Sequence, residues 1–88
     1  MSDGQPQLVL YSKPGCHLCD EMKHVLDRVR ARTPFTLRVV DISLDPDLLA
    51  RYGMEIPVLE IDGRKVAKFR ITERELEDTL VRRRVRST

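Results

Sequence analysis

The fold is decided by residues 8–19, which read Leu-Val-Leu-Tyr-Ser-Lys-Pro-Gly-Cys-His-Leu-Cys. The first four residues are a continuous apolar run of strand length, and such a run predicts a strand covered on both faces in the middle of an α/β sheet. The next four residues form a turn, and Cys16 then stands where the strand ends and a helix begins. This stretch therefore predicts a pair of cysteines at the amino end of a helix that follows a central strand.

Apolar residues with a 3.6-residue period predict that this helix covers residues 17–31. They form one stripe that consists of Leu18, Met22, Val25, Leu26 and Val29. Residues 36–42 alternate and are rich in β-branched side chains, so they predict a second strand. Asp45 and Pro46 then provide a cap and a first residue for a short helix that ends at Gly53. We expect this short helix to turn three side chains inward: Leu48, Leu49 and Tyr52.

The last third of the chain predicts a hairpin and a final helix. Residues 58–61 and 65–69 have strand patterns on either side of Asp62-Gly63, which is a strong hairpin signal. Thr72 and Glu75 form a capping box at the start of the final helix, with Ile71 and Leu76 at the positions of a hydrophobic staple. Its predicted buried stripe consists of Leu76, Leu80 and Val81.

The predicted order is βαβαββα, an α/β fold in which three helices cover a four-stranded mixed sheet. We expect strands joined through helices to be parallel and the final hairpin to add an antiparallel pair. The predicted domain covers residues 8–81, between a flexible N-terminus at residues 1–7 and a basic C-terminal tail at residues 82–88.

Composition narrows the functional class. The 88 residues suffice for one small domain, and no apolar run approaches the roughly 18 residues of a membrane span. Sixteen basic and 14 acidic residues are nearly balanced, which argues against a nucleic-acid binder. The first residues lack the apolar core of a secretory signal, so we expect a cytoplasmic protein, and we expect a monomer. In a reducing compartment a Cys-x-x-Cys pair is more often redox-active or metal-binding than structural.

The predicted position of Cys16 favours its thiolate, because a helix N-terminus stabilises an anion. A thiol with a pKa of about 8.5 is only about 3% ionised at pH 7, and a pKa of about 6 makes it roughly 90% thiolate. We expect Cys16 to attack a disulfide and Cys19, three residues later, to resolve the mixed disulfide. His17 and Lys13 are candidates for lowering the pKa of Cys16. Equally, His17 fits a solvated residue, and Lys13 fits either a plain turn lysine or a contact to a substrate carboxylate.

Two other functional classes remain open at this point. Cys16, Cys19, His17 and His24 contain the start of a metal set, so a metal or iron–sulfur carrier is an alternative, although a structural zinc site usually takes a second pair of ligands. A non-catalytic binding module with the same fold is another.

Residues 11–19, the element order, and Ile56-Pro57-Val58 ahead of an Asp-Gly hairpin together resemble the thioredoxin superfamily, and within it the small glutaredoxin-like proteins of bacteria. The resemblance implies that Pro57 is cis and lies beside the active disulfide, and that the backbone of Ile56 pairs with a substrate chain. It matches Lys13 with a lysine that contacts a glutathione carboxylate. It also implies no bound cofactor, electrons from glutathione or a reductase protein, and either protein disulfides or glutathione mixed disulfides as substrates.

Two segments depart from that family's pattern. Typical glutaredoxins carry a glycine pair and an acidic residue after the last strand, where residues 68–72 here read Lys-Phe-Arg-Ile-Thr. His17 and Leu18 replace the usual proline and tyrosine between the cysteines. We therefore expect glutathione to bind less tightly than in a typical glutaredoxin.

Overall fold

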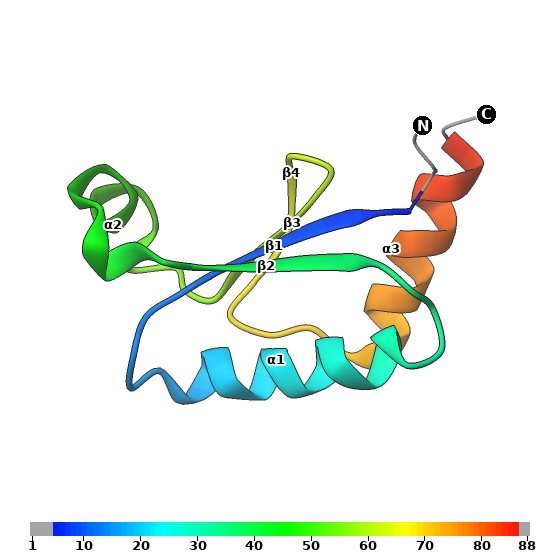
Figure 1. Cartoon of the computed structure of the whole chain (residues 1–88), viewed down its shortest axis with the longest axis horizontal. Coiled ribbons are helices and arrows are strands. Elements are labelled where there is room, and N and C mark those ends of the chain that lie inside the picture. The colour runs from blue at the N-terminus through cyan, green and yellow to red at the C-terminus, as the bar shows by residue number, and fades with distance from the viewer. Residues whose placement is uncertain (1–4, 87–88) are drawn as a thin grey trace.

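The computed structural model describes residues 5–86, and their side chains as far as Arg83. The elements in chain order are β1 (Gln7–Ser12), α1 (His17–Arg30), β2 (Thr36–Asp41), the 3₁₀ helix η1 (Ile42–Leu44), α2 (Pro46–Tyr52), β3 (Val58–Ile61), β4 (Arg64–Lys68) and α3 (Glu73–Arg86). The βαβαββα order is confirmed, with η1 as an addition (Figure 1). Of the predicted terminal segments, residues 1–4 and 87–88 lie outside the described part, while Gln7 belongs to β1 and residues 82–86 to α3.

The four strands form one mixed sheet in the order β2-β1-β3-β4. Strand β1 is parallel to β2 and antiparallel to β3, and β3 is antiparallel to β4. The expectation that helix-linked strands are parallel is correct for β1 and β2 but wrong for β2 and β3. The chain leaves β2, forms α2 beyond that end of the sheet, and enters β3 from the same end on the other side of β1, so β3 runs opposite to β2 (Figure 1).

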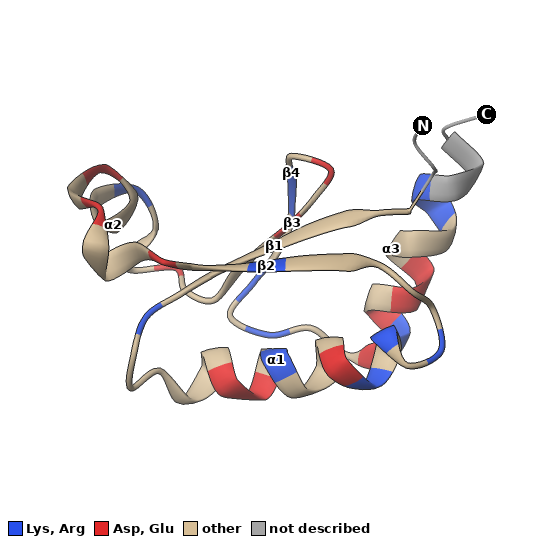
Figure 2. Cartoon of the chain, viewed as in Figure 1, with Lys and Arg blue, Asp and Glu red and all other residues tan. Residues whose placement is uncertain are grey.

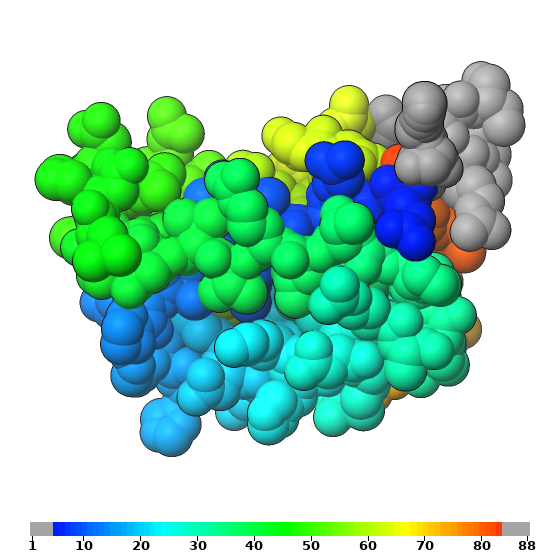
Figure 3. Space-filling model, in the orientation of Figure 1, coloured from blue at the N-terminus to red at the C-terminus, as the bar shows by residue number. Residues whose placement is uncertain are grey.

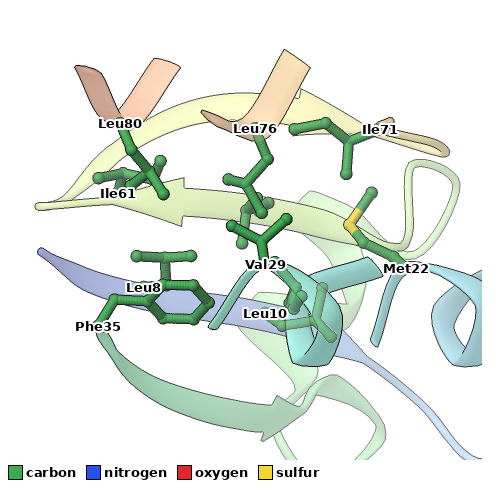
Figure 4. Close-up of a cluster of buried hydrophobic side chains, with 11 residues drawn as sticks. Leu8, Leu10, Met22, Val29, Phe35, Ile61, Ile71, Leu76 and Leu80 are labelled. Atoms are coloured by element: carbon green, nitrogen blue, oxygen red, sulfur yellow. The ribbon is translucent and has the colours of Figure 1, made fainter. Parts of the chain in front are cut away.

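One face of the sheet is covered by α1 and α3 and holds the main core (Figure 4). Its buried side chains come from the sheet, from the two helices and from the segments next to them, and are Leu8, Leu10, Met22, Leu26, Val29, Phe35, Leu59, Ile61, Ile71, Leu76 and Leu80. Hydrophobic burial of this set, at about 1.5–3 kcal/mol for each large side chain, is the main force that holds α1 and α3 on the sheet. The space-filling view shows α1 closing this side of the molecule along its whole length (Figure 3).

A second, smaller cluster lies under α2 and consists of buried Ile42, Tyr52 and Val58, with Tyr11, Leu48 and Ile56 packed against them. The prediction that Leu49 points inward is wrong, because Leu48 and Tyr52 share the inner side of α2 and the next position along the helix, Leu49, turns 41% of its surface to solvent. Val81 is 59% exposed for the same reason, since the i and i+4 pair of Leu76 and Leu80 faces the core.

The helix boundaries follow from caps that the sequence provides. The Thr72 hydroxyl accepts the Glu75 N–H at 3.0 Å, and the Glu75 carboxylate accepts the Thr72 N–H at 3.0 Å, which confirms the predicted capping box. The Asp45 carboxylate accepts the N–H groups of Asp47 and Leu48 at the start of α2. None of the described helices is long and apolar enough to cross a membrane.

Charged residues of both signs occur along α1 and α3 (Figure 2). Arg32 near the end of α1 bonds to two carboxylates of α3, Glu73 at 3.0 Å and Glu77 at 2.6 Å, and Arg28 bonds to Glu73 at 2.5 Å. These pairs join the two helices at the surface, where solvent weakens each of them.

Candidate active site

Cys16 lies at the junction of β1 and α1. Gly15 precedes it with φ +80°, a left-handed conformation that a glycine adopts without steric cost, and lets the chain turn from strand to helix. Cys16 itself is extended (φ −96°, ψ 107°) and caps α1, because its Sγ accepts the Cys19 N–H at 3.1 Å. A sulfur at this position meets the positive end of the helix dipole.

Cys16 and Cys19 are joined in a disulfide, with their Cα atoms 5.2 Å apart. The two cysteines differ in accessibility, since Cys16 is half-buried and Cys19 is only 4% exposed. Lys13 and His17 flank Cys16 along the chain and both are exposed. Among the described residues neither of them forms a salt bridge.

The Ile56–Pro57 peptide bond is cis, as the resemblance predicts. Tyr11 pairs with Val58 across β1 and β3, so Pro57 lies at the end of the sheet where β1 finishes and leads to Cys16. Pro57 is buried, and Ile56 is half-buried in the small cluster with Tyr11. The topology therefore brings the cysteines and the cis proline to one end of the sheet, at the left of Figure 1.

Sequence reasoning missed one residue at this end. Phe69 is predicted to lie in a strand over residues 65–69, but β4 ends at Lys68 and Phe69 is left-handed with φ +69°. Its N–H donates to the Pro57 carbonyl at 2.9 Å. Its only signal in the sequence is that it falls in the segment where this chain departs from typical glutaredoxins.

A groove of about 180 Å³ lies between α1 and residues 69–72. Its apolar lining comes from Leu18, Met22, Val25, Phe69 and Ile71, and its polar lining from Glu21, Arg70, Thr72 and Glu75. Arg70 approaches Glu21 at 3.6 Å across it. Because Leu18 is in the first turn of α1, the groove begins at the turn that Cys16 caps.

One carboxylate and two tyrosines form a small polar cluster at the end of β1 that leads to Cys16. Glu60 accepts hydrogen bonds from the Tyr11 hydroxyl at 3.3 Å and the Tyr52 hydroxyl at 3.2 Å, and the two rings lie 4.7 Å apart. Partial burial, followed by the negative charge and hydrogen bond of Glu60, raises the pKa of Tyr11 above 10.0. The cluster fixes the last residues of β1 before the turn to Cys16.

The family model for the glutaredoxin-like domain (DUF836) matches residues 7–81. This chain belongs to that family. The glutaredoxin-like chain is 25% identical over 83 residues to an uncharacterized protein of Mycobacterium bovis, covering 89% of this chain and 86% of that protein.

Solved structures show the same fold. A crystal structure of a protein from X. campestris has a TM-score of 0.75 and 30% identity, and covers 85% of this chain and 96% of that one. Desulfothioredoxin from Desulfovibrio vulgaris Hildenborough has a TM-score of 0.66 and 30% identity, and covers 89% of this chain and 81% of that one. The thioredoxin-like fold, together with the Cys16–Cys19 pair, supports a redox role for the glutaredoxin-like chain.

The alternative metal set is not assembled. Within residues 5–86, no group of three or more histidine, cysteine or acidic side chains is placed to hold a metal ion. His24 is exposed on α1, two turns beyond Cys16. Of the predicted set, only the two cysteine sulfurs are in contact.

Proposed function

We propose that this glutaredoxin-like protein is a thiol–disulfide oxidoreductase in which Cys16 attacks and Cys19 resolves. The observation that carries this proposal is the asymmetry of the pair: an accessible Cys16 caps α1, and a buried Cys19 is bonded to it. An accessible sulfur at a helix N-terminus suits a nucleophile, because its thiolate is stabilised there. A buried partner within reach suits a resolving thiol.

In the reductive direction the Cys16 thiolate attacks one sulfur of a substrate disulfide, and the other substrate sulfur leaves as a thiolate that takes up a proton. The Cys19 thiolate then attacks the Cys16 sulfur in the mixed disulfide and releases the second substrate thiol. The substrate gains two electrons and two protons, and the protein ends with the Cys16–Cys19 disulfide. The Cys19 N–H that donates to the Cys16 sulfur, together with exposed Lys13 and His17, favours the Cys16 thiolate.

The backbone of Ile56 is the proposed docking edge for the substrate chain. Among the described residues, no hydrogen bond engages the N–H or carbonyl of Ile56, whereas the Pro57 carbonyl is already bonded to Phe69. An extended substrate segment that pairs with Ile56 would form the main-chain bonds of an added strand. Pairing of this kind accepts many sequences, because it uses backbone atoms.

The proposal includes the partners that this chemistry requires. Substrates are protein disulfides or glutathione mixed disulfides, and electrons come from glutathione or from a reductase protein, without a bound cofactor. A reducing cytoplasm is the compartment in which such a cycle runs. Lys13 is the proposed contact for a substrate carboxylate. The metal-carrier and binding-module alternatives gain no specific support from the described residues.

A redox titration tests the proposal. The protein is equilibrated in buffers of defined glutathione ratio, its thiols are blocked with an alkylating agent, and its mass is measured. We expect a reversible change between a dithiol and an intramolecular disulfide. Cysteines that stay alkylatable in every buffer, or that never react, would refute the redox assignment.

Two variants assign the roles of the cysteines. Cys16→Ser should lose reduction of a model disulfide down to the uncatalysed rate, because no accessible thiolate remains. Cys19→Ser should accumulate a mixed disulfide on Cys16 that is visible by mass. A Cys16→Ser protein that still reduces disulfides would show that the assignment is wrong, and His24→Ala on the same helix serves as a control that should retain activity.

A further inference from the structure

Phe69 holds a backbone conformation that its side chain disfavours. Positive φ is uncommon for residues other than glycine, and for bulky residues it is a true outlier. Among the described residues the other such case is Asp62, which precedes Gly63 in the hairpin turn, and aspartate tolerates this conformation well. Strain of this kind tends to occur at functional sites, where the surrounding structure maintains it.

The fold does not need the Phe69 ring. The ring is absent from both buried clusters, and the residue is 42% exposed. The bond that holds the backbone, from the Phe69 N–H to the Pro57 carbonyl, uses no side-chain atom. A glycine would make the same bond without steric cost. The structure thus maintains an exposed aromatic ring at a position where glycine would be the easier residue.

The ring forms one wall of the groove that begins at the first turn of α1, which Cys16 caps. Leu18 from the first turn of α1 and Ile71 line the same groove, and Met22 and Val25 complete its apolar part. The bond to Pro57 ties this wall to the segment that carries Ile56. A substrate chain paired with Ile56 therefore passes beside the ring.

Charges of both signs lie at this groove, because Glu21, Arg70 and Glu75 all line it. Lys68 lies with its Nζ 5.6 Å from the centre of the Phe69 ring, and Arg70 follows the ring in the chain. Each of these cations has an acidic partner, Glu55 at 3.9 Å for Lys68 and Glu21 at 3.6 Å for Arg70. Because the charges at the groove are of both signs, its apolar walls are the feature that distinguishes one substrate from another.

We propose that the groove receives an apolar side chain of a protein substrate, next to the substrate cysteine, and that Phe69 determines this specificity. This inference rests on the proposed oxidoreductase function and adds its substrate class. Apolar walls stabilise an aliphatic side chain by excluding water, whereas they offer little to a small, fully charged peptide such as glutathione. Phe69 thus favours protein disulfides over glutathione disulfides.

The decisive variant is Phe69→Gly, because it removes the ring and also relieves the backbone. Wild-type and variant protein are assayed for reduction of two peptide disulfides of equal length, one with Leu-Cys-Glu and one with Ser-Cys-Glu around the cysteine, and of oxidised glutathione. For wild type we expect kcat/KM for the leucine peptide to exceed that for the serine peptide by about tenfold, which corresponds to about 1.4 kcal/mol. In Phe69→Gly the two peptides should react equally, and reduction of oxidised glutathione should be unchanged or faster.

Two controls separate this role from a structural one. Val81→Ala removes another exposed apolar side chain, on α3, and should leave the ratio of the two peptides unchanged. Urea denaturation should show Phe69→Gly unfolding at a concentration close to that of wild type, so that a lost preference is not a lost fold.

The outcomes are distinct. A Phe69→Gly protein that keeps the leucine preference overturns the role of Phe69, and so does an equal loss on all three substrates. A wild-type protein that reduces both peptides at one rate overturns the groove and leaves the oxidoreductase function intact. A wild-type protein that reduces none of the substrates overturns both.

Discussion

The two phenylalanines of the chain stand at opposite ends of the sheet. Phe35 directly precedes β2, at the end where β1 begins, and is 2% exposed in the main core. The Arg30 Nε donates to its carbonyl at 3.0 Å and the guanidinium lies 5.7 Å from its ring. Phe69 directly follows β4, at the disulfide end, and leaves 42% of its surface exposed. The same residue type therefore contributes packing at one end and remains available to a partner at the other.

The same contrast separates the two left-handed residues other than glycine on either side of β4, Asp62 and Phe69. Asp62, at the Phe35 end, exchanges two hydrogen bonds with Gln7: its N–H donates to the Gln7 carbonyl at 2.8 Å and its carboxylate accepts the Gln7 N–H at 3.1 Å. The carboxylate also pairs with Arg83. Asp62 thus has internal partners that explain its conformation. The backbone of Phe69 is held by the bond from its N–H to the Pro57 carbonyl, and its exposed ring has the Lys68 Nζ at 5.6 Å. At the Phe35 end of the sheet these side chains contact other parts of the protein, whereas at the disulfide end the Phe69 side chain stays exposed.

The largest expected effect comes from truncating the buried phenylalanine. Phe35→Ala should lower the free energy of unfolding by about 3–5 kcal/mol, because it leaves a cavity in the main core. Phe69→Ala should change it by less than about 1 kcal/mol, since the ring is outside the buried clusters. Urea denaturation at pH 7 measures both, and equal losses would contradict the contrast between the two ends.

Asp62 should have the next largest effect. Partial burial acts to raise its pKa, but the hydrogen bonds from Arg83 and the Gln7 N–H outweigh this and lower the pKa below its ordinary value of 3.8. Asp62→Ala should cost about 1 kcal/mol at pH 7, since solvent screens a partly exposed carboxylate. A group with a lowered pKa stabilises the fold above its unfolded pKa and loses this effect as the pH falls through the folded pKa. The difference from wild type should therefore shrink below about pH 3.8, whereas Asp78→Ala on α3 should show neither effect.

Tyr11, near the disulfide end, should affect the stability of the fold at alkaline pH. Tyr11→Phe removes its hydrogen bond to Glu60 and should cost about 0.5–1 kcal/mol at pH 8. Because the pKa of Tyr11 is raised, its contribution is complete below pH 10.0 and is lost as the pH rises through the folded pKa. Thermal unfolding at pH 8 and above pH 10 should show wild type losing more stability than Tyr11→Phe. An equal loss in both proteins would mean that groups other than Tyr11 cause the loss of stability at alkaline pH.

The smallest effect is expected for the ion pairs between α1 and α3. Arg32→Ala removes the bonds to Glu73 and Glu77, which lie at the surface. The loss of stability should be small at low salt and should vanish in about 1 M salt, where the screening length is only about 3 Å. Arg74→Ala provides a matched control on α3. A loss that persists at high salt would mean that packing of the Arg32 stem matters more than its charge.

Local patterns predicted most of the fold. The capping box of Thr72 and Glu75, the Asp45 cap and the Asp-Gly hairpin depend on residues a few positions apart, and each is confirmed. The direction of β3 is not local, since it depends on which side of β1 the chain returns to. The apolar pattern does not separate buried from exposed positions that are neighbours in a helix, so the predicted burial of Leu49 and Val81 is wrong.

At the candidate site, the cysteines follow from their spacing and the cis Pro57 from the resemblance, and the structure contains both the disulfide and the cis bond. Phe69 could not be predicted in this way. Its type and the alternation over residues 65–69 favour a strand, and only the long-range bond to the Pro57 carbonyl sets its conformation. The conformation of such a residue is set by contacts with residues far away in the sequence, so the residues on either side of it do not predict it.

The strand order also bears on how the protein behaves at high concentration. Strands β2 and β4 are the two edges of the sheet, and an open edge is a template for another chain. Strand β4 carries exposed Arg64, Lys65 and Lys68 on only five residues, and β2 carries exposed Arg38 at its middle. A second copy that tried to extend the sheet through β4 would bring cation against cation. The cations on both edge strands therefore oppose extension of the sheet by further copies of this chain.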